Sequence, residues 1–180
     1  PSLGWRPLGT KLRAAVIGVG HLGQHHARIY AENPEVELIG VVDSDEERGR
    51  KIARKCRTEY FSELTPLLGR LDVASVVVPT AQHYPFAKTL LENDVHVLVE
   101  KPFTQTVEEA QELLELQRKH GKIVQVGHVE RFNPAIQAIR GLVFDPVFVE
   151  VHRLCPYNPR GTDVGVVLDL MIHDIEIVLN

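Results

Sequence analysis

The sequence predicts an α/β protein in which a doubly wound parallel sheet is followed by the start of an incomplete α+β domain. Three observations carry this prediction. Up to about residue 127, short apolar runs alternate with segments of helical periodicity, and the connections between them are short. The first such connection holds the glycine pattern Gly18-x-Gly20-x-x-Gly23. We therefore expect two domains, 1–127 and 128–180.

The first strand and helix, expected at 12–17 and 21–31, enclose the glycine pattern. In such a turn the first glycine permits the tight bend, the second lets the backbone approach a pyrophosphate, and the third permits close packing of the helix on the strand. The N–H groups and the dipole at the helix start favour phosphate charge. The pattern predicts a dinucleotide-binding turn.

Asp43 directly follows the second expected strand, 36–42, and lies 20 residues after Gly23. A carboxylate at this position can accept hydrogen bonds from the ribose hydroxyls of NAD, and it repels the additional phosphate of NADP. We therefore expect NAD as the cofactor and consider NADP the weaker candidate.

The remaining elements of the first domain continue the alternation. The run 73–78 is almost continuously apolar, which is typical of a strand covered on both faces. Thr106 and Glu109 have the spacing of a capping box, and Gly121 has the place of a C-terminal cap. We expect further strands at 73–78, 95–99 and 123–127, helices at 45–56, 82–93 and 106–120, and a shorter helix near 62–69.

From about residue 128 the pattern changes. Asn133-Pro134 predicts a helix start, with the helix running to about Gly141, and residues 146–154 alternate imperfectly like a strand of a new sheet. The stretch 166–180 has helical periodicity. One strand and one helix cannot close a core. We expect that the chain is the first half of something longer, or that another copy completes this edge in a homo-oligomer.

The composition narrows the functional classes. The chain has 180 residues, 44% of them hydrophobic, and a net charge of -4 with scattered basic residues, so we expect no nucleic-acid partner. No apolar run has the length of a membrane span, and the first ten residues lack the apolar core of a signal peptide. Cys56 and Cys155 form no metal-binding or CxxC spacing. These features favour a cytoplasmic protein with no membrane partner.

Glu100-Lys101-Pro102 follows the expected strand 95–99, at the edge of the sheet where ligands bind in this class of fold. A lysine beside a nicotinamide could share a proton with a substrate hydroxyl, and partial burial would lower its pKa toward the useful range. The bond before Pro102 could be cis. By position alone, an exposed lysine after a strand explains Lys101 at least as well.

Asp169 and His173 are four residues apart on the last expected helix, so they share one face. A carboxylate beside an imidazole raises its basicity, as a base that deprotonates a hydroxyl requires. By spacing alone, an ordinary pair on a helix surface explains them about as well. Asp174 points about 100° away from that face, and we expect it to be solvated or a charge on the helix surface.

The other candidates are weaker. His21 and His25 have the spacing of two metal ligands, but no third ligand lies nearby, so we expect no metal site. His128 and Arg131 could contact substrate or could be satisfied polar residues at a domain junction. Arg160, in a loop rich in proline and glycine, could bind an anionic substrate group.

Taken together, these motifs resemble the glucose–fructose oxidoreductase/inositol dehydrogenase/MocA family, and the resemblance runs from about Lys11 to the last residue. Its strongest marks are Glu100-Lys101-Pro102 and the later aspartate–histidine helix, in the same order as in the family. The matching set is Gly18 to Gly23, Asp43, Pro79-Thr80 with His83, Glu100-Lys101-Pro102, Gly127-His128 with Arg131 to Pro134, and Asp169 to His173.

The resemblance implies an NAD(P)-dependent dehydrogenase that acts on a sugar or cyclitol hydroxyl. It implies that Lys101 is the catalytic lysine, that His173 is the acid/base and that Asp169 assists it. The implied cofactor-binding residues are Gly18, Gly20, His21, Leu22, Gly23, Asp43, Pro79, Thr80, His83, Glu100 and Lys101. The implied substrate-binding residues are His128, Arg131, Asn133 and Arg160.

Within the family, residues 127–134 and 168–175 look most like members that oxidise the 3-hydroxyl of UDP-N-acetylglucosamine, which prepares an amino sugar for lipid A. Family members have well over 300 residues, with a large open sheet that forms one wall of the substrate site. Because that sheet is almost absent from these 180 residues, the alternative is an NAD-binding module or fragment without catalysis. A dehydrogenase for a cyclitol or another sugar is a further alternative.

Overall fold

The computed structural model describes residues 10–139, 147–154 and 165–179. The chain divides into two compact units, one ending at Val126 and the other beginning at Gly127. The first unit contains a parallel sheet with helices on both faces, as the sequence predicts.

The sheet has six parallel strands in the order β3-β2-β1-β4-β5-β6. β1 lies in the middle and pairs with β2 on one side and β4 on the other, so the strand order reverses between β1 and β4. Ligands bind at such a switch point, outside the carboxyl ends of the strands. The strands are β1 (Leu12–Ile17), β2 (Val36–Val42), β3 (Glu59–Phe61), β4 (Val73–Val76), β5 (His96–Val99) and β6 (Val124–Val126).

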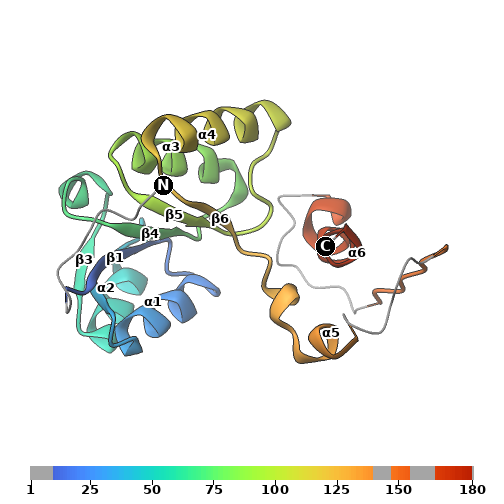
Figure 1. Cartoon of the computed structure of the whole chain (residues 1–180). Helices are drawn as coiled ribbons and strands as arrows, with labels where there is room; N and C mark the ends of the chain where they lie inside the picture. The colour runs from blue at the N-terminus through green and yellow to red at the C-terminus, as the bar shows by residue number, and fades with distance from the viewer. Residues whose placement is uncertain (1–9, 140–146, 155–164, 180) are drawn as a thin grey trace. The chain divides into compact units, whose positions relative to one another are not determined.

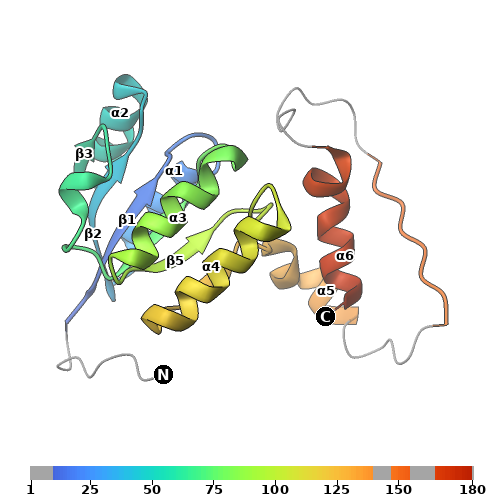
Figure 2. The same cartoon turned by 90° about the horizontal axis from the view of Figure 1, so that it is seen from above.

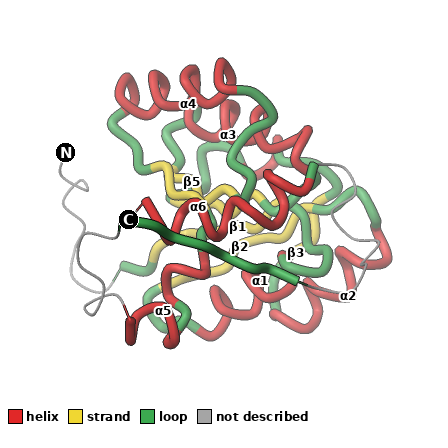
Figure 3. The backbone as a smooth tube through the Cα atoms, turned by 90° about the vertical axis from the view of Figure 1, so that its right-hand side faces the viewer, coloured by secondary structure: helices red, strands yellow, loops and turns green. Residues whose placement is uncertain are grey.

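Two layers of helices cover the sheet, α1 and α2 on one face and α3 and α4 on the other (Figures 1 and 3). α3 and α4 lie side by side (Figure 2). Each face has its own apolar cluster, because alternate strand residues point to opposite faces. The helices are α1 (Gly23–Glu32), α2 (Glu46–Cys56), α3 (His83–Glu92) and α4 (Val107–His120).

The helix ends follow the sequence signals in part. The capping box of Thr106 and Glu109 is present at α4, and Gly121 ends that helix in the left-handed conformation, which confirms both predictions. Asp45 caps α2 by accepting a hydrogen bond from the N–H of Arg48. α1, which follows the glycine turn, has no side-chain cap. Its first N–H groups are therefore not covered by a capping side chain.

The first unit differs from the expected elements in three places. β3 was not predicted, because only its pairing with β2 identifies so short a strand. The strand expected at 73–78 ends at Val76, since β1 ends beside it at Ile17 and the chain then turns away. The helix expected near 62–69 is a single 3₁₀ turn, Thr65–Leu67.

The described part of the second unit contains a 3₁₀ turn (Val129–Phe132) and two short α-helices, α5 (Pro134–Ile139) and α6 (Ile172–Leu179). A π-helical turn at Val167–Met171 precedes α6. The strand predicted at 146–154 is wrong for its described part, since residues 147–154 form no strand. Their alternation is a property of the side chains, whereas a strand also needs a pairing partner, and the described part of this unit offers none. Pro146 lies outside the described residues.

We predict that Gly23→Ala lowers the free energy of unfolding by about 2–4 kcal/mol, because a Cβ at this position would lie 1.8 Å from the carbonyl oxygen of Gly18. Gly20→Ala is the matched control, since a Cβ there meets no atom within 4 Å. Urea unfolding followed by circular dichroism measures both. Equal stability of the two variants would contradict the close approach of α1 to β1.

Candidate functional site: a dinucleotide cavity

The glycine turn after β1 uses its glycines in three different ways. Gly18 has a positive φ of 83°, and its N–H donates to the carbonyl oxygen of Val42 at 2.8 Å. Gly23 lies against the backbone of Gly18, so packing requires a glycine there. At Gly20 the space that a side chain would fill is open. Packing within the chain therefore does not explain Gly20, whereas close approach of a ligand to the backbone does.

A cavity of about 280 Å³ opens beside this turn at the carboxyl edge of the sheet. The ends of β1 and β2 and the residues directly after β4 contribute to its wall, so it lies at the switch point of the strand order. Its lining residues are Ile17, Gly18, Gly20, Val42, Asp43, Ser44, Arg48, Ser62, Val77, Val78, Pro79, Gln82 and Phe86. The cavity thus brings together the predicted residues Gly18, Gly20, Asp43 and Pro79.

The other predicted cofactor residues of the first unit do not line this cavity. Gly23 packs against Gly18 in the glycine turn, and Thr80 is buried in the 3₁₀ turn before α3. The predicted residues that are not part of its lining are His21, Leu22, Gly23, Thr80, His83, Glu100 and Lys101.

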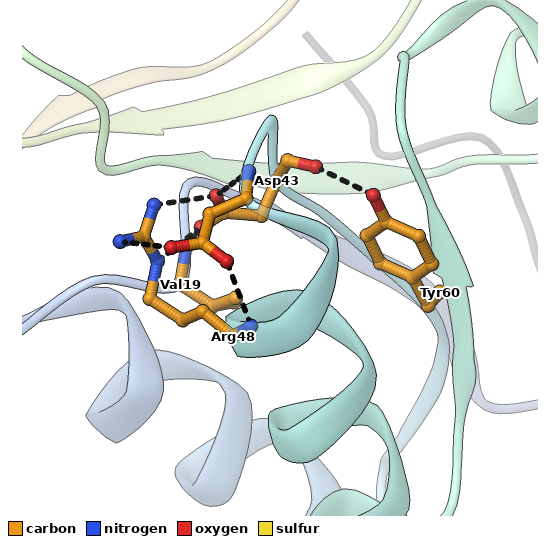
Figure 4. Close-up of polar contacts among 5 residues, drawn as sticks. Val19, Asp43, Arg48 and Tyr60 are labelled. Carbon is orange, nitrogen blue, oxygen red and sulfur yellow. Dashed lines mark hydrogen bonds and ion pairs between the residues drawn. The ribbon is translucent and has the colours of Figure 1, made fainter.

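Asp43 is buried at the end of β2, and both of its carboxylate oxygens are engaged (Figure 4). Oδ2 accepts from the N–H of Val19 at 2.9 Å and from Nε of Arg48 at 3.0 Å. Oδ1 accepts from the N–H of Asp45 at 2.9 Å and from Nη2 of Arg48 at 2.6 Å. Tyr60 donates its hydroxyl to the Asp43 carbonyl oxygen at 3.0 Å. Asp43 therefore connects the glycine turn, the start of α2 and β3.

Asp43 and Arg48 are the charged residues among those lining the cavity, and they neutralise each other. Burial alone would raise the pKa of the Asp43 carboxyl, but the hydrogen bonds from Arg48, Asp45 and Val19 outweigh it and hold the pKa below its usual value. The Arg48 side chain is 44% exposed and can move, whereas Asp43 is held from several sides. A ribose that donates to Asp43 must share or replace the bonds from Arg48, because a carboxylate offers about four acceptor positions.

The cavity lining also includes polar residues that were not among the predicted site residues, namely Arg48, Ser44, Ser62 and Gln82. A signal for Arg48 was present in the sequence. It lies five residues after Asp43, in the first turn of the following helix, and a basic residue at that distance can reach the strand end from which the helix starts.

Glu100, Lys101 and Pro102 form the turn after β5, and the Lys101–Pro102 bond is cis, which the sequence analysis had allowed. The fully buried ring of His83 lies with Nδ1 2.8 Å from the carbonyl oxygen of Pro102 and Nε2 2.8 Å from that of Val78. Both ring nitrogens therefore face the backbone. His83 connects the chain after β4 to the turn that carries Lys101.

Asp169 and His173 lie in the second unit, Asp169 in the π-helical turn and His173 in the first turn of α6. Single turns of π-helix occur often at functional sites. Of the two alternatives for Asp174, the solvated carboxylate is wrong, because Arg153 binds it through Nε and Nη2 at distances from 2.7 to 3.1 Å. Those hydrogen bonds also lower the pKa of Asp174.

The predicted substrate residues have the following positions. Nδ1 of His128 is enclosed and has no hydrogen-bond partner within the described residues. Arg131 donates from Nε to the buried Glu176 at 2.7 Å. Asn133 accepts from the N–H of Ala135 and so caps α5, as its sequence predicts. Arg160 lies outside the described residues. The substrate roles of these residues stay predictions.

His21 and His25 pack edge to face with their ring centroids 6.1 Å apart. Within residues 10–139, 147–154 and 165–179, no group of three potential metal ligands is present. None of the helices in these ranges is long and apolar enough to cross a bilayer. The homo-oligomer and the cytoplasmic location stay predictions.

Comparison with known proteins gives relatives that include sugar and cyclitol dehydrogenases. UDP-N-acetylglucosamine 3-dehydrogenase of Acidithiobacillus ferrooxidans is 40% identical over 169 residues, which cover 93% of this chain and 53% of the relative. The scyllo-inositol 2-dehydrogenase (NAD(+)) of Bacillus subtilis is 29% identical, with coverage of 93% and 53%. The chain thus spans about half the length of these curated relatives.

Solved structures agree with this comparison. The A. ferrooxidans enzyme superposes with a TM-score of 0.87 at 40% identity, over 94% of this chain and 55% of that one. GenD2 from gentamicin A biosynthesis, solved in complex with NAD, gives a TM-score of 0.72 at 28% identity, over 77% and 42%. Residues 12–128 match the Gfo/Idh/MocA model, described as an oxidoreductase family with an NAD-binding Rossmann fold. The chain therefore belongs to the Gfo/Idh/MocA oxidoreductase family, and its first unit is the NAD-binding Rossmann domain of that family.

Proposed function

We propose that this chain takes part in the NAD-dependent oxidation of a sugar hydroxyl. The observation that carries the proposal is the position of Lys101. It lies on the turn after β5, at the same carboxyl edge of the sheet as the glycine turn and Asp43. A cofactor domain with a lysine at that edge offers a proton-sharing group where ligands of this fold bind.

Each residue of the proposed site has its own role in the reaction. Bound NAD would supply the hydride acceptor for the carbon that carries the hydroxyl. His173 takes the hydroxyl proton, so the C–OH group becomes a carbonyl, and Asp169 raises the basicity of the imidazole. Lys101 donates a hydrogen bond to the reacting oxygen and holds it in place. Gly20 and Asp43 bind the pyrophosphate and the adenosine ribose of the cofactor.

For the substrate we propose a nucleotide sugar, with the 3-hydroxyl of UDP-N-acetylglucosamine as the reacting group. The 40% identity to an enzyme of that name supports this choice. Guanidinium groups suit the diphosphate of such a substrate, and Arg131 and Arg160 are the candidates. A cyclitol is the second candidate, supported by the 29% identity to the scyllo-inositol enzyme.

We predict that Gly20→Ala weakens NADH binding by about tenfold or more, because the added methyl occupies the space needed by the pyrophosphate. The stability of the chain should remain unchanged, since the methyl meets no protein atom within 4 Å. Fluorescence titration with NADH measures the affinity. An unchanged dissociation constant would show that the pyrophosphate does not approach this turn.

The Asp43–Arg48 pair should set the preference for NADH over NADPH. Arg48→Gln removes the countercharge of Asp43, so the preference should widen by about threefold to tenfold. Asp43→Asn removes the carboxylate charge that repels the additional phosphate of NADPH and leaves Arg48 paired with Asp45 alone, so the preference should narrow or reverse. Paired titrations with NADH and NADPH give the ratio of the two dissociation constants.

Arg54→Gln is the matched control for charge, because Arg54 is an exposed arginine of α2 that does not line the cavity. The double variant Asp43→Asn/Arg48→Gln should return the ratio toward that of the unaltered chain. If Arg48→Gln and Arg54→Gln change the ratio equally, the local pair has no part in cofactor selection.

We predict that His173→Ala and Lys101→Ala each reduce turnover of UDP-N-acetylglucosamine about a hundredfold or more and leave NADH affinity unchanged. Initial rates of NADH formation measure turnover. Normal turnover in either variant removes that residue from the chemistry. Tight NADH binding without turnover of any nucleotide sugar or cyclitol would favour a binding module instead.

A further inference from the structure

A buried chain of polar groups crosses the layer between α1 and the sheet. His26 and Tyr30 lie on α1, Ser75 lies on β4, and Glu100 follows β5. Nε2 of His26 is 3.1 Å from Oε1 of Glu100, and Nδ1 is 3.2 Å from Oγ of Ser75. The Tyr30 hydroxyl is 2.8 Å from the same Oγ.

These groups are shielded from water. Ser75 is fully buried, Glu100 is 7% exposed, and the side chain of His26 is 17% exposed. The same layer also contains an apolar cluster that includes Val16 and Ala27. Polar groups in such a place must find partners inside the protein, because an unpaired buried polar group destabilises the fold.

The hydrogen-bond roles follow from the chemistry of the groups. Carboxylate oxygens accept hydrogen bonds, so the contact of His26 with Glu100 is an Nε2–H group that donates a hydrogen bond to Oε1. Burial raises the pKa of the Tyr30 phenol, although the bond with Ser75 opposes this, so the phenol stays protonated and can donate to Oγ. The Ser75 hydroxyl can then donate to Nδ1, so that each group in the chain has a hydrogen-bond partner.

The chain of contacts ends at the turn that carries Lys101. Oε2 of Glu100 accepts from the N–H of Lys101 at 3.2 Å, while Oε1 accepts from His26. His26 of α1 thus binds one oxygen of the Glu100 carboxylate. The other oxygen binds the N–H of Lys101, in the turn after β5. The orientation of that turn depends on a donor supplied by the helix that follows the glycine turn.

We propose that His26 is a positioning residue. Through Glu100 it fixes the position of the turn carrying Lys101 relative to α1 and the glycine turn. The proposal rests on the proposed function at one point, which is the role of Lys101 in the reaction. The contacts that it invokes do not depend on the substrate. His25, the preceding residue, is exposed on the same helix and takes no part in the chain of contacts.

The test is amide hydrogen exchange at Lys101, followed by NMR on the whole 180-residue chain. His26→Leu fills the space without a donor, so exchange of the Lys101 N–H should accelerate about tenfold. His26→Gln supplies an amide donor and should stay near the unaltered rate. His25→Leu is the matched control and should leave the rate unchanged.

Ser75→Ala, a small change on β4, should accelerate exchange at Lys101 by a smaller factor than His26→Leu does. Exchange rates of the β1 amides report global stability in each variant.

Unchanged exchange at Lys101 in both His26→Leu and Ser75→Ala would overturn the proposal. Acceleration in His26→Gln equal to that in His26→Leu would also overturn it, because the donor would then be irrelevant. In turnover assays, His26→Leu should lower kcat with little change in the dissociation constant of NADH. If the unaltered chain turns over no sugar, the proposed function fails, and the exchange experiment still decides the role of His26.

Discussion

The contact on which the cofactor site depends most is the one between the Asp43 carboxylate and three separate parts of the chain. It accepts from Val19 in the glycine turn, from Asp45 at the cap of α2 and from the Arg48 guanidinium. These bonds fix the distance between the glycine turn and the end of β2, which is the distance that a dinucleotide must span between pyrophosphate and ribose. Because Asp43 is buried, losing its partners would leave an uncompensated charge in the cavity wall.

The strand order brings the other parts of the site to the same edge. With β4 beside β1 and β5 beside β4, the turns after these strands follow one another along the carboxyl end of the sheet. A buried histidine, His83, and a partly buried one, His26, then hold the turn after β5. His83 joins the chain after β4 to Pro102, and His26 joins α1 to Glu100. The turn that carries Lys101 is thus held from both sides of the sheet by side chains that line no part of the cofactor cavity.

The sequence allowed most of the first unit to be predicted, because buried parallel strands leave continuous apolar runs and the glycine pattern has a fixed geometry. β1 and β2 have the expected bounds. β3 could not be predicted, since three residues carry too little pattern. The strand expected from the alternation at 147–154 is absent from the described residues, because alternation does not supply a pairing partner. The spacing after the glycine pattern predicts Asp43, and the position of Arg48 in the first turn of the next helix is a signal for their contact. The His26–Ser75–Glu100 chain depends on strand order and helix packing, which spacing does not reveal.

A crystal structure of the chain with NADH tests the central claim most directly, namely that Asp43 and the glycine turn together bind the dinucleotide. We expect a pyrophosphate oxygen against the backbone at Gly20 and the adenosine ribose hydroxyls about 3 Å from the Asp43 carboxylate, with Arg48 displaced from at least one oxygen. A dinucleotide bound elsewhere would contradict the account. So would a ribose that leaves all the Asp43 bonds to Val19, Asp45 and Arg48 intact, since the carboxylate would then be purely structural.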